Sequence, residues 1–202
     1  GVAMRFSYHP WTSVVAAVAV WLGLLPLATM VQGVGYLIET GLVVATAGLI
    51  GLGAAALRLP RAAVLLGQIL GVGAMVTWRA LALSGAALSE PIEAMRFLVA
   101  EGLVTIRTGA APVEPTPGLL WLIVLFTALL VLVVELLVNV LEQPAWAIAP
   151  LALAYGIAAI TLIVDLSFVY VLPVVVGYLA VLLSATGLAE QATGKASRVA
   201  AY

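Results

Sequence analysis

Long apolar runs, separated by short polar segments, make up most of the sequence. A helix needs roughly 20 apolar residues to cross the hydrocarbon core of a bilayer, and several runs reach that length. They predict an all-α membrane protein, with a bundle of about six transmembrane helices within residues 1–188. The predicted spans cover residues 11–29, 36–57, 62–83, 118–141, 145–164 and 167–188.

Residues 84–117 form a long segment between the third and fourth predicted spans, where charges, prolines and glycines interrupt the apolar pattern. Ser89 is a predicted N-cap for a helix over about residues 90–106. Its apolar positions recur every three or four residues and therefore share one face: Ile92, Met95, Val99, Leu103 and Ile106. This pattern is typical of an amphipathic helix that lies in the membrane interface.

The composition fits a membrane protein and narrows its function. Hydrophobic residues make up 65% of the chain, and charged residues only 8%. A net charge of −1 without a cluster of Lys and Arg argues against a nucleic-acid partner. The chain has no cysteine and a single histidine, His9, which argues against a thiol nucleophile, a nucleophile–base pair or a metal site. We therefore expect no enzyme activity and no cofactor within these residues.

The positively charged residues predict the orientation, because cytoplasmic loops carry the excess of Lys and Arg. Two of them, Arg96 and Arg107, lie in the 84–117 segment, and five lie on the other predicted side: Arg5, Arg58, Arg61, Lys195 and Arg198. We expect a plasma-membrane protein with both ends cytoplasmic, including a tail at 189–202, and with the 84–117 segment outside.

The first apolar run is too long for the core of a signal peptide, so we expect it to stay in the membrane as a helix. Aromatic residues near the predicted span ends are expected to anchor the helices at the membrane interfaces. They are Tyr8, Trp11, Tyr36, Trp78, Trp121, Trp146 and Tyr170.

Ionisable residues within a span are candidates for function, because a charge in the membrane is costly. Glu39 and Arg79 lie near the outer ends of the second and third spans, so consecutive antiparallel helices bring them to similar depth. We expect the two side chains to pair. The pair would serve either as part of a polar path or docking site, or only to satisfy an arginine that reaches towards the interface.

A second group of polar residues is predicted deeper, towards the inner side. Glu135 lies in the fourth span, and Asn139 follows one turn later on the same face. Gln68 of the third span is expected at comparable depth. A proton-coupled transporter places a carboxylate in such a position, and a structural hydrogen bond between helices explains it equally well.

The outer loop carries a further signal in the segments EGLVTIRT at 101–108, APV at 111–113 and TPGL at 116–119. These segments resemble the loop before the fourth span in TgpA-like proteins, the membrane-anchored transglutaminase-like family. The acid at Glu135, the turn Gln143-Pro144-Ala145 and the order of the spans are also similar to that family.

The resemblance implies a non-catalytic membrane anchor or scaffold for a cell-envelope enzyme. Family members continue with a further span and an extracytoplasmic domain that bears a Cys-His-Asp triad, and no residue of that triad is carried over here. Partners would be membrane lipids, an extracytoplasmic domain of the same protein, or other membrane subunits. The loop residues expected to face such a partner are Glu101, Arg107, Pro112 and Pro117. A small transporter or channel-like bundle and a lipid-binding accessory subunit are the alternatives.

Overall fold

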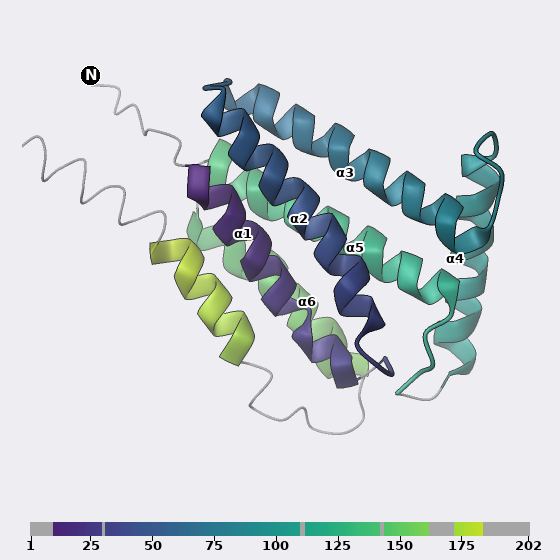
Figure 1. Cartoon of the computed structure of the whole chain (residues 1–202). Coiled ribbons are helices and arrows are strands. Elements are labelled where there is room, and N and C mark those ends of the chain that lie inside the picture. The colour runs from purple at the N-terminus through teal and green to yellow at the C-terminus, as the bar shows by residue number, and fades with distance from the viewer. Residues whose placement is uncertain (1–9, 30, 110–111, 142–143, 162–171, 184–202) are drawn as a thin grey trace, which may run out of the picture.

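The computed structural model describes residues 10–29, 31–109, 112–141, 144–161 and 172–183 (Figure 1). The regular elements of these residues are helices, joined by one isolated parallel bridge between Val31 and Val113. The helices are α1 (Pro10–Gly23), the 3-10 helix η1 (Leu25–Thr29), α2 (Gly35–Ala56), α3 (Arg61–Ser84), α4 (Pro91–Thr108), α5 (Pro117–Glu135), the π-helix η2 (Leu136–Val140), the 3-10 helix η3 (Pro144–Ala147), α6 (Ile148–Thr161) and the helix Leu172–Leu183.

Four helical segments of the described residues are long and apolar enough to cross a membrane, which makes the chain a multi-pass membrane protein. They are Trp11–Ala28, Gly35–Ala56, Arg61–Ser84 and Pro117–Val140. Their bounds lie within one residue of the first four predicted spans. Of the fifth and sixth predicted spans, the structure describes the shorter helices α6 and Leu172–Leu183, and the residues between them lie outside the described part.

The termini of α3 and α5 follow from local sequence. α3 ends at Gly85, which adopts a left-handed φ of 69° that glycine accepts without steric cost. α5 begins with a proline at its first position, after Thr116, whose hydroxyl oxygen accepts a hydrogen bond from the backbone N–H of Leu119. The predicted cap of α4 is wrong: its N-cap is Glu90 rather than Ser89, and no side-chain hydrogen bond caps it.

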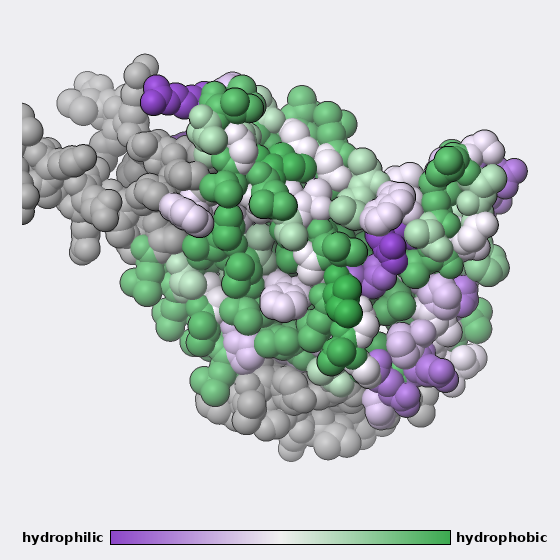
Figure 2. Space-filling model, in the orientation of Figure 1, coloured by the Kyte–Doolittle hydropathy of each residue, from purple (hydrophilic) through white to green (hydrophobic). Residues whose placement is uncertain are grey.

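The long helices α1, α2, α3 and α5 lie side by side, and α5 packs against each of the others and against α4 (Figure 1). Their shared core consists of small and branched side chains, including Val20, Val43, Val72, Val124 and Val131. Figure 2 shows apolar side chains over most of the face formed by α1, α2 and α3, with hydrophilic residues towards its two ends, at the upper left and on the side where α4 lies. That distribution fits a bundle whose sides face lipid.

Helix α4 lies across the end of the bundle where α3 ends and α5 begins (Figure 1). Its buried residues are Ala94, Leu98 and Gly102, spaced four apart. The predicted apolar face of α4 therefore contacts the bundle only in part. Met95 and Val99 are half-buried against the core, whereas the other apolar residues of that face are exposed. Two of the three buried residues, Ala94 and Gly102, are small, which lets α4 and α5 approach closely.

Two glycines set that approach. A Cβ atom added to Gly102 would lie 2.8 Å from the carbonyl oxygen of Gly118, and one added to Gly118 would lie 2.5 Å from the backbone nitrogen of Gly102. The hydroxyl groups of Thr105 and Thr116 share a hydrogen bond of 2.8 Å beside this contact. Backbone thus packs on backbone here, as in other helix pairs with small residues at their crossing.

The turn between α1 and α2 meets the loop between α4 and α5. The backbone N–H of Gln32 donates to the carbonyl of Val113 at 2.9 Å, and its side-chain amide donates to the carbonyl of Pro112 at 3.1 Å. Both connections therefore lie at one end of the bundle. The turn after the first span and the loop before the fourth span are both predicted to lie outside. Spans of alternating direction require two such connections to lie on the same side of the membrane.

Two of the aromatic residues predicted as interface anchors are buried instead. Trp121 is 3% exposed and its indole N–H donates to the carbonyl of Val76 at 3.1 Å, and Tyr36 is 1% exposed. Trp11, Trp78 and Trp146 are exposed, as an anchor should be. Tyr8 and Tyr170 lie outside the described residues. A ring near a span end can also face a neighbouring helix, where a backbone carbonyl accepts a hydrogen bond from its polar group.

We predict that Gly102→Ala destabilises the bundle by about 1–3 kcal/mol, because the added methyl group has to push backbone away from backbone. The matched control is Gly73→Ala in α3, where an added Cβ meets nothing within 4 Å. Thermal unfolding of the detergent-purified protein measures both. Equal midpoints for the two variants would contradict the close contact between α4 and α5.

Candidate functional site

Four buried polar side chains meet between α1, α3 and α5, and we call them the Glu135 cluster: Ser13, Gln68, Glu135 and Asn139. Ser13 lies near the start of α1, Gln68 in the first half of α3, and Glu135 at the end of α5. Because α1 and α3 run opposite to α5, these positions come to similar depth. Each side chain of the cluster is at most 7% exposed.

One carboxylate oxygen of Glu135 collects the hydrogen bonds of the cluster. Oε2 accepts a bond from the Ser13 hydroxyl at 3.3 Å and a short one from the Asn139 amide. The same amide nitrogen lies 3.4 Å from the Ser13 Oγ. The other oxygen, Oε1, is fully buried and has no hydrogen-bond partner in the described part of the chain.

The helix changes type directly after Glu135. Residues 136–140 form the π-helix η2, in which the backbone N–H of Leu141 donates to the carbonyl of Leu136 at 2.9 Å, five residues earlier. Single π-turns of this kind within α-helices are rare and occur frequently at functional sites. Here the turn carries Asn139, which it holds against the Glu135 carboxylate.

Gly51 of α2 makes room for the cluster. A Cβ atom at this position would collide with the Ser13 side chain and would lie 3.0 Å from Nε2 of Gln68. Gln68 itself donates from Nε2 to the carbonyl of Ala47 at 3.1 Å, which ties α3 to α2. The cluster is therefore enclosed by α1, α2, α3 and α5 together.

The expected contact between Glu39 and Arg79 is present. Arg79 donates from Nε to Oε2 of Glu39 at 2.7 Å and from Nη2 to Oε1 at 2.5 Å, and both side chains are about one-sixth exposed. The guanidinium also lies 5.2 Å from the ring centroid of Trp78. Both carboxylate oxygens are engaged, so the pair acts first as a bidentate link between α2 and α3.

The four predicted loop residues lie at one end of the bundle and do not form a single cluster. Arg107 and Pro117 are exposed, and Glu101 is half-buried beside Gly118. Pro112 is exposed, and its carbonyl accepts the bond from Gln32. Among the described residues, no group of three His, Cys, Asp or Glu side chains is placed to hold a metal ion.

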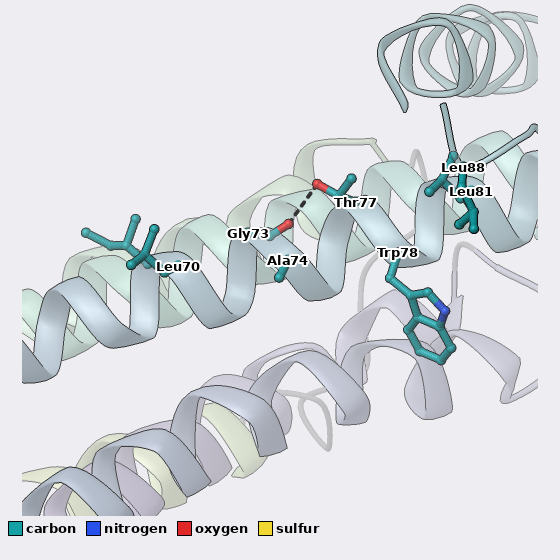
Figure 3. A pocket seen from close by; sticks show the side chains of 8 residues that line it. Leu70, Gly73, Ala74, Thr77, Trp78, Leu81 and Leu88 are labelled. Carbon is teal, nitrogen blue, oxygen red and sulfur yellow. Dashed lines mark hydrogen bonds between the residues drawn. The ribbon is translucent and has the colours of Figure 1, made fainter. Parts of the chain in front are cut away.

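A shallow groove runs along the outward face of α3 (Figure 3). Its lining is mostly apolar, and its polar groups are the indole N–H of Trp78 and the hydroxyl of Thr77, which donates to the carbonyl of Gly73 at 2.9 Å. Leu70, Trp78 and Leu81 line it, and Leu88 closes it from the segment that follows α3. The groove therefore offers a mainly hydrocarbon surface to a ligand. The hydroxyl of Thr77 is already hydrogen-bonded within its own helix.

Ser13 is the member of the Glu135 cluster that the sequence analysis missed. The available signal was only approximate: Ser13 lies near the start of the predicted first span and Glu135 in the last two turns of the fourth, so both belong to the inner ends of their helices. Hydropathy does not reveal which non-consecutive helices touch, and this contact spans 122 residues.

No protein-family model, curated protein or solved structure matches the chain. The resemblance of the outer loop to TgpA-like proteins therefore stays a prediction. What the residues themselves present is a buried carboxylate cluster at one end of the bundle, and an ion pair and a crosswise helix at the other.

We predict that Glu39→Gln and Arg79→Gln each destabilise the protein by about 2 kcal/mol, since each leaves a largely buried charged group without its partner. The double variant should lose less than the sum of the two, which a double-mutant cycle in thermal or denaturant unfolding measures. The control is the exposed pair Glu93–Arg96, with an N···O distance of 3.5 Å. Glu93→Gln should change stability by less than about 1 kcal/mol. Additive losses at Glu39 and Arg79 would show that the pair contributes no coupling.

Proposed function

We propose that the chain is a non-catalytic membrane scaffold that holds α4 at the outer membrane interface for a partner. The observation that carries this proposal is the lock between α4 and α5, in which Gly102 packs directly on Gly118. A helix that is held in the membrane interface by its apolar face alone needs no such backbone contact with another helix. A helix that presents a surface to a partner gains from being fixed, because less order is then lost on binding.

The exposed side of α4 is amphipathic. Ile92, Phe97 and Val104 are exposed apolar residues, and Glu93 and Arg96 are exposed charged residues on the same helix. Such a surface suits the boundary between acyl chains and headgroups, where one part stays wet. Its position across the ends of α3 and α5 supports this placement (Figure 1).

The resemblance of the 101–119 region suggests which partner α4 serves. In TgpA-like proteins a bundle of this kind anchors an extracytoplasmic transglutaminase-like domain. Our proposal is that α4 contacts such a domain of the same protein, or another membrane subunit, in the plasma membrane with both ends of this chain cytoplasmic. The catalytic groups would then belong to the partner.

Membrane lipids are the second class of partner. The groove on α3 supports this assignment because its lining is mostly apolar and Thr77 is already satisfied by its own helix. An acyl chain fits such a surface without loss of the Thr77 hydrogen bond. A lipid-binding accessory subunit is thus an extension of the scaffold proposal rather than a rival to it.

A small ion transporter is the alternative that a specific observation favours. Glu135 places a carboxyl group deep in the bundle, and buried carboxyl groups are common in ion pathways. The scaffold remains our first proposal, because the same carboxyl group is tied to Ser13 and Asn139 and links α1 to α5. Uptake of radioactive sodium into proteoliposomes, compared with empty vesicles, would favour the transporter.

We predict that a thiol at Thr108→Cys reacts with a membrane-impermeant maleimide added from outside intact cells, since α4 lies on the outer side in this proposal. The chain has no cysteine, so each variant carries a single thiol. The control is Leu57→Cys, at the exposed turn between α2 and α3, which should react only after the cells are permeabilised. Reversed labelling would mean the opposite orientation, and labelling of both from one side would contradict the bundle.

We further predict that a photo-crosslinking benzoylphenylalanine in place of Phe97 captures a protein domain outside the membrane when the full gene product is studied in native membranes. Phe97 is 59% exposed on α4. The same residue in place of Leu129, which is 57% exposed on α5, should capture lipid. Mass spectrometry identifies the products. Lipid products alone at both positions would overturn the partner-binding role of α4.

A further inference from the structure

The geometry points to a monovalent metal cation, with sodium as the natural probe, bound at Oε1 of Glu135 within the Glu135 cluster. This inference goes beyond the scaffold proposal and does not depend on it. A resident ion would stabilise the bundle whether or not α4 holds a partner.

No basic side chain of the described residues balances the charge of the Glu135 carboxylate. Glu135 is 1% exposed, and no arginine or lysine of the described residues pairs with it. Arg79, the intramembrane arginine, is already engaged by Glu39. Charged side chains within membrane bundles normally have a partner, because an isolated charge there is costly. A bound cation supplies the partner that the described chain does not.

One oxygen of the Glu135 carboxylate lacks a hydrogen-bond donor among the residues that the structure describes. Ser13 and Asn139 both donate to Oε2, which leaves Oε1 buried without a hydrogen bond in the described part of the chain. A hydrogen-bond donor at Oε1 is missing among the described residues. A metal cation needs only electron pairs, which Oε1 offers.

The side chains of the Glu135 cluster carry several oxygen atoms that can bind a cation. Hard cations prefer carboxylate, amide and hydroxyl oxygens, and the cluster combines these types in Glu135, Ser13 and the amides of Gln68 and Asn139. One of the two N–H groups of the Gln68 amide donates to the Ala47 carbonyl. A single carboxylate supplies one negative charge, which matches a monovalent rather than a divalent ion.

The backbone is also irregular at this place. The π-helix η2 begins at Leu136, directly after the carboxylate, and interrupts the regular ladder of α5 at this position. A π-turn costs helical regularity and is retained mostly where it positions a functional group. Here it holds Asn139 against Oε2 of Glu135, which leaves Oε1 of the same carboxylate for the cation.

The test is an ion titration of the purified full chain in lipid nanodiscs, with thermal unfolding followed by tryptophan fluorescence. Sodium chloride replaces choline chloride at constant ionic strength and pH. We expect sodium to raise the unfolding midpoint in a saturable manner by at least about 3 °C, because a ligand that binds only the folded state stabilises it. Lithium and potassium titrations report the size preference.

Variants assign the response to the cluster. Glu135→Gln keeps the size of the side chain and should abolish the sodium response, and Ser13→Ala should raise the apparent Kd for sodium about tenfold. Glu93→Gln, on the exposed side of α4, should leave the response unchanged. If Glu135→Gln does not fold, the wild-type titration and Ser13→Ala decide the question.

Two results would overturn the proposal. The first is a midpoint that is the same in sodium and choline across the titration. The second comes from repeating the titration at several pH values: a midpoint that follows pH and is unaffected by sodium at each of them would mean that only a proton binds to Glu135. A sodium response that persists unchanged in Glu135→Gln would place the ion elsewhere and would also reject this site.

Discussion

The requirement that governs this structure is that polar groups within an apolar bundle must find their partners inside the protein. Threonine hydroxyls meet it within their own helix, as in the bonds from Thr40 to the carbonyl of Tyr36 and from Thr127 to that of Ile123, each 2.8 Å long. Larger polar groups meet it across helices, and in doing so they fix which helices adjoin. The Trp121 bond to Val76 and the Glu39–Arg79 pair are two such links.

Small residues decide how closely those links can form. Gly118 and Gly102 let the backbones of α5 and α4 touch, and Gly51 leaves the space that Ser13 and Gln68 occupy. Without an aqueous driving force between helices, this close packing contributes much of the association energy. The close packing that glycine allows therefore both places α4 and encloses the Glu135 cluster, although these two features lie at opposite ends of the bundle.

Hydropathy predicted the first four spans to within one residue, because their length is set by the thickness of the membrane rather than by tertiary contacts. The Glu39–Arg79 contact was also predictable, since consecutive antiparallel helices align residues by depth alone. The Ser13–Glu135 contact was not, because it depends on α1 adjoining α5. Trp121, Tyr36 and the start of α4 were misjudged for a related reason: a position near a span end does not reveal whether a neighbouring helix or lipid lies beside it.

Helix α5 is the element on which both ends depend. Its spanning segment is the most apolar of the four, with a mean hydropathy of 2.9, and is twice as buried as that of α3, at 56% against 28%. It carries Gly118 at the end that holds α4 and Glu135 at the end that holds the cluster. The stretch of α5 between these two residues is regular α-helix, and the π-turn begins only after Glu135. The contact with α4 and the Glu135 carboxylate are therefore held at a fixed separation by one uninterrupted ladder of backbone hydrogen bonds, and the irregular turn affects only the side of the cluster that Asn139 supplies.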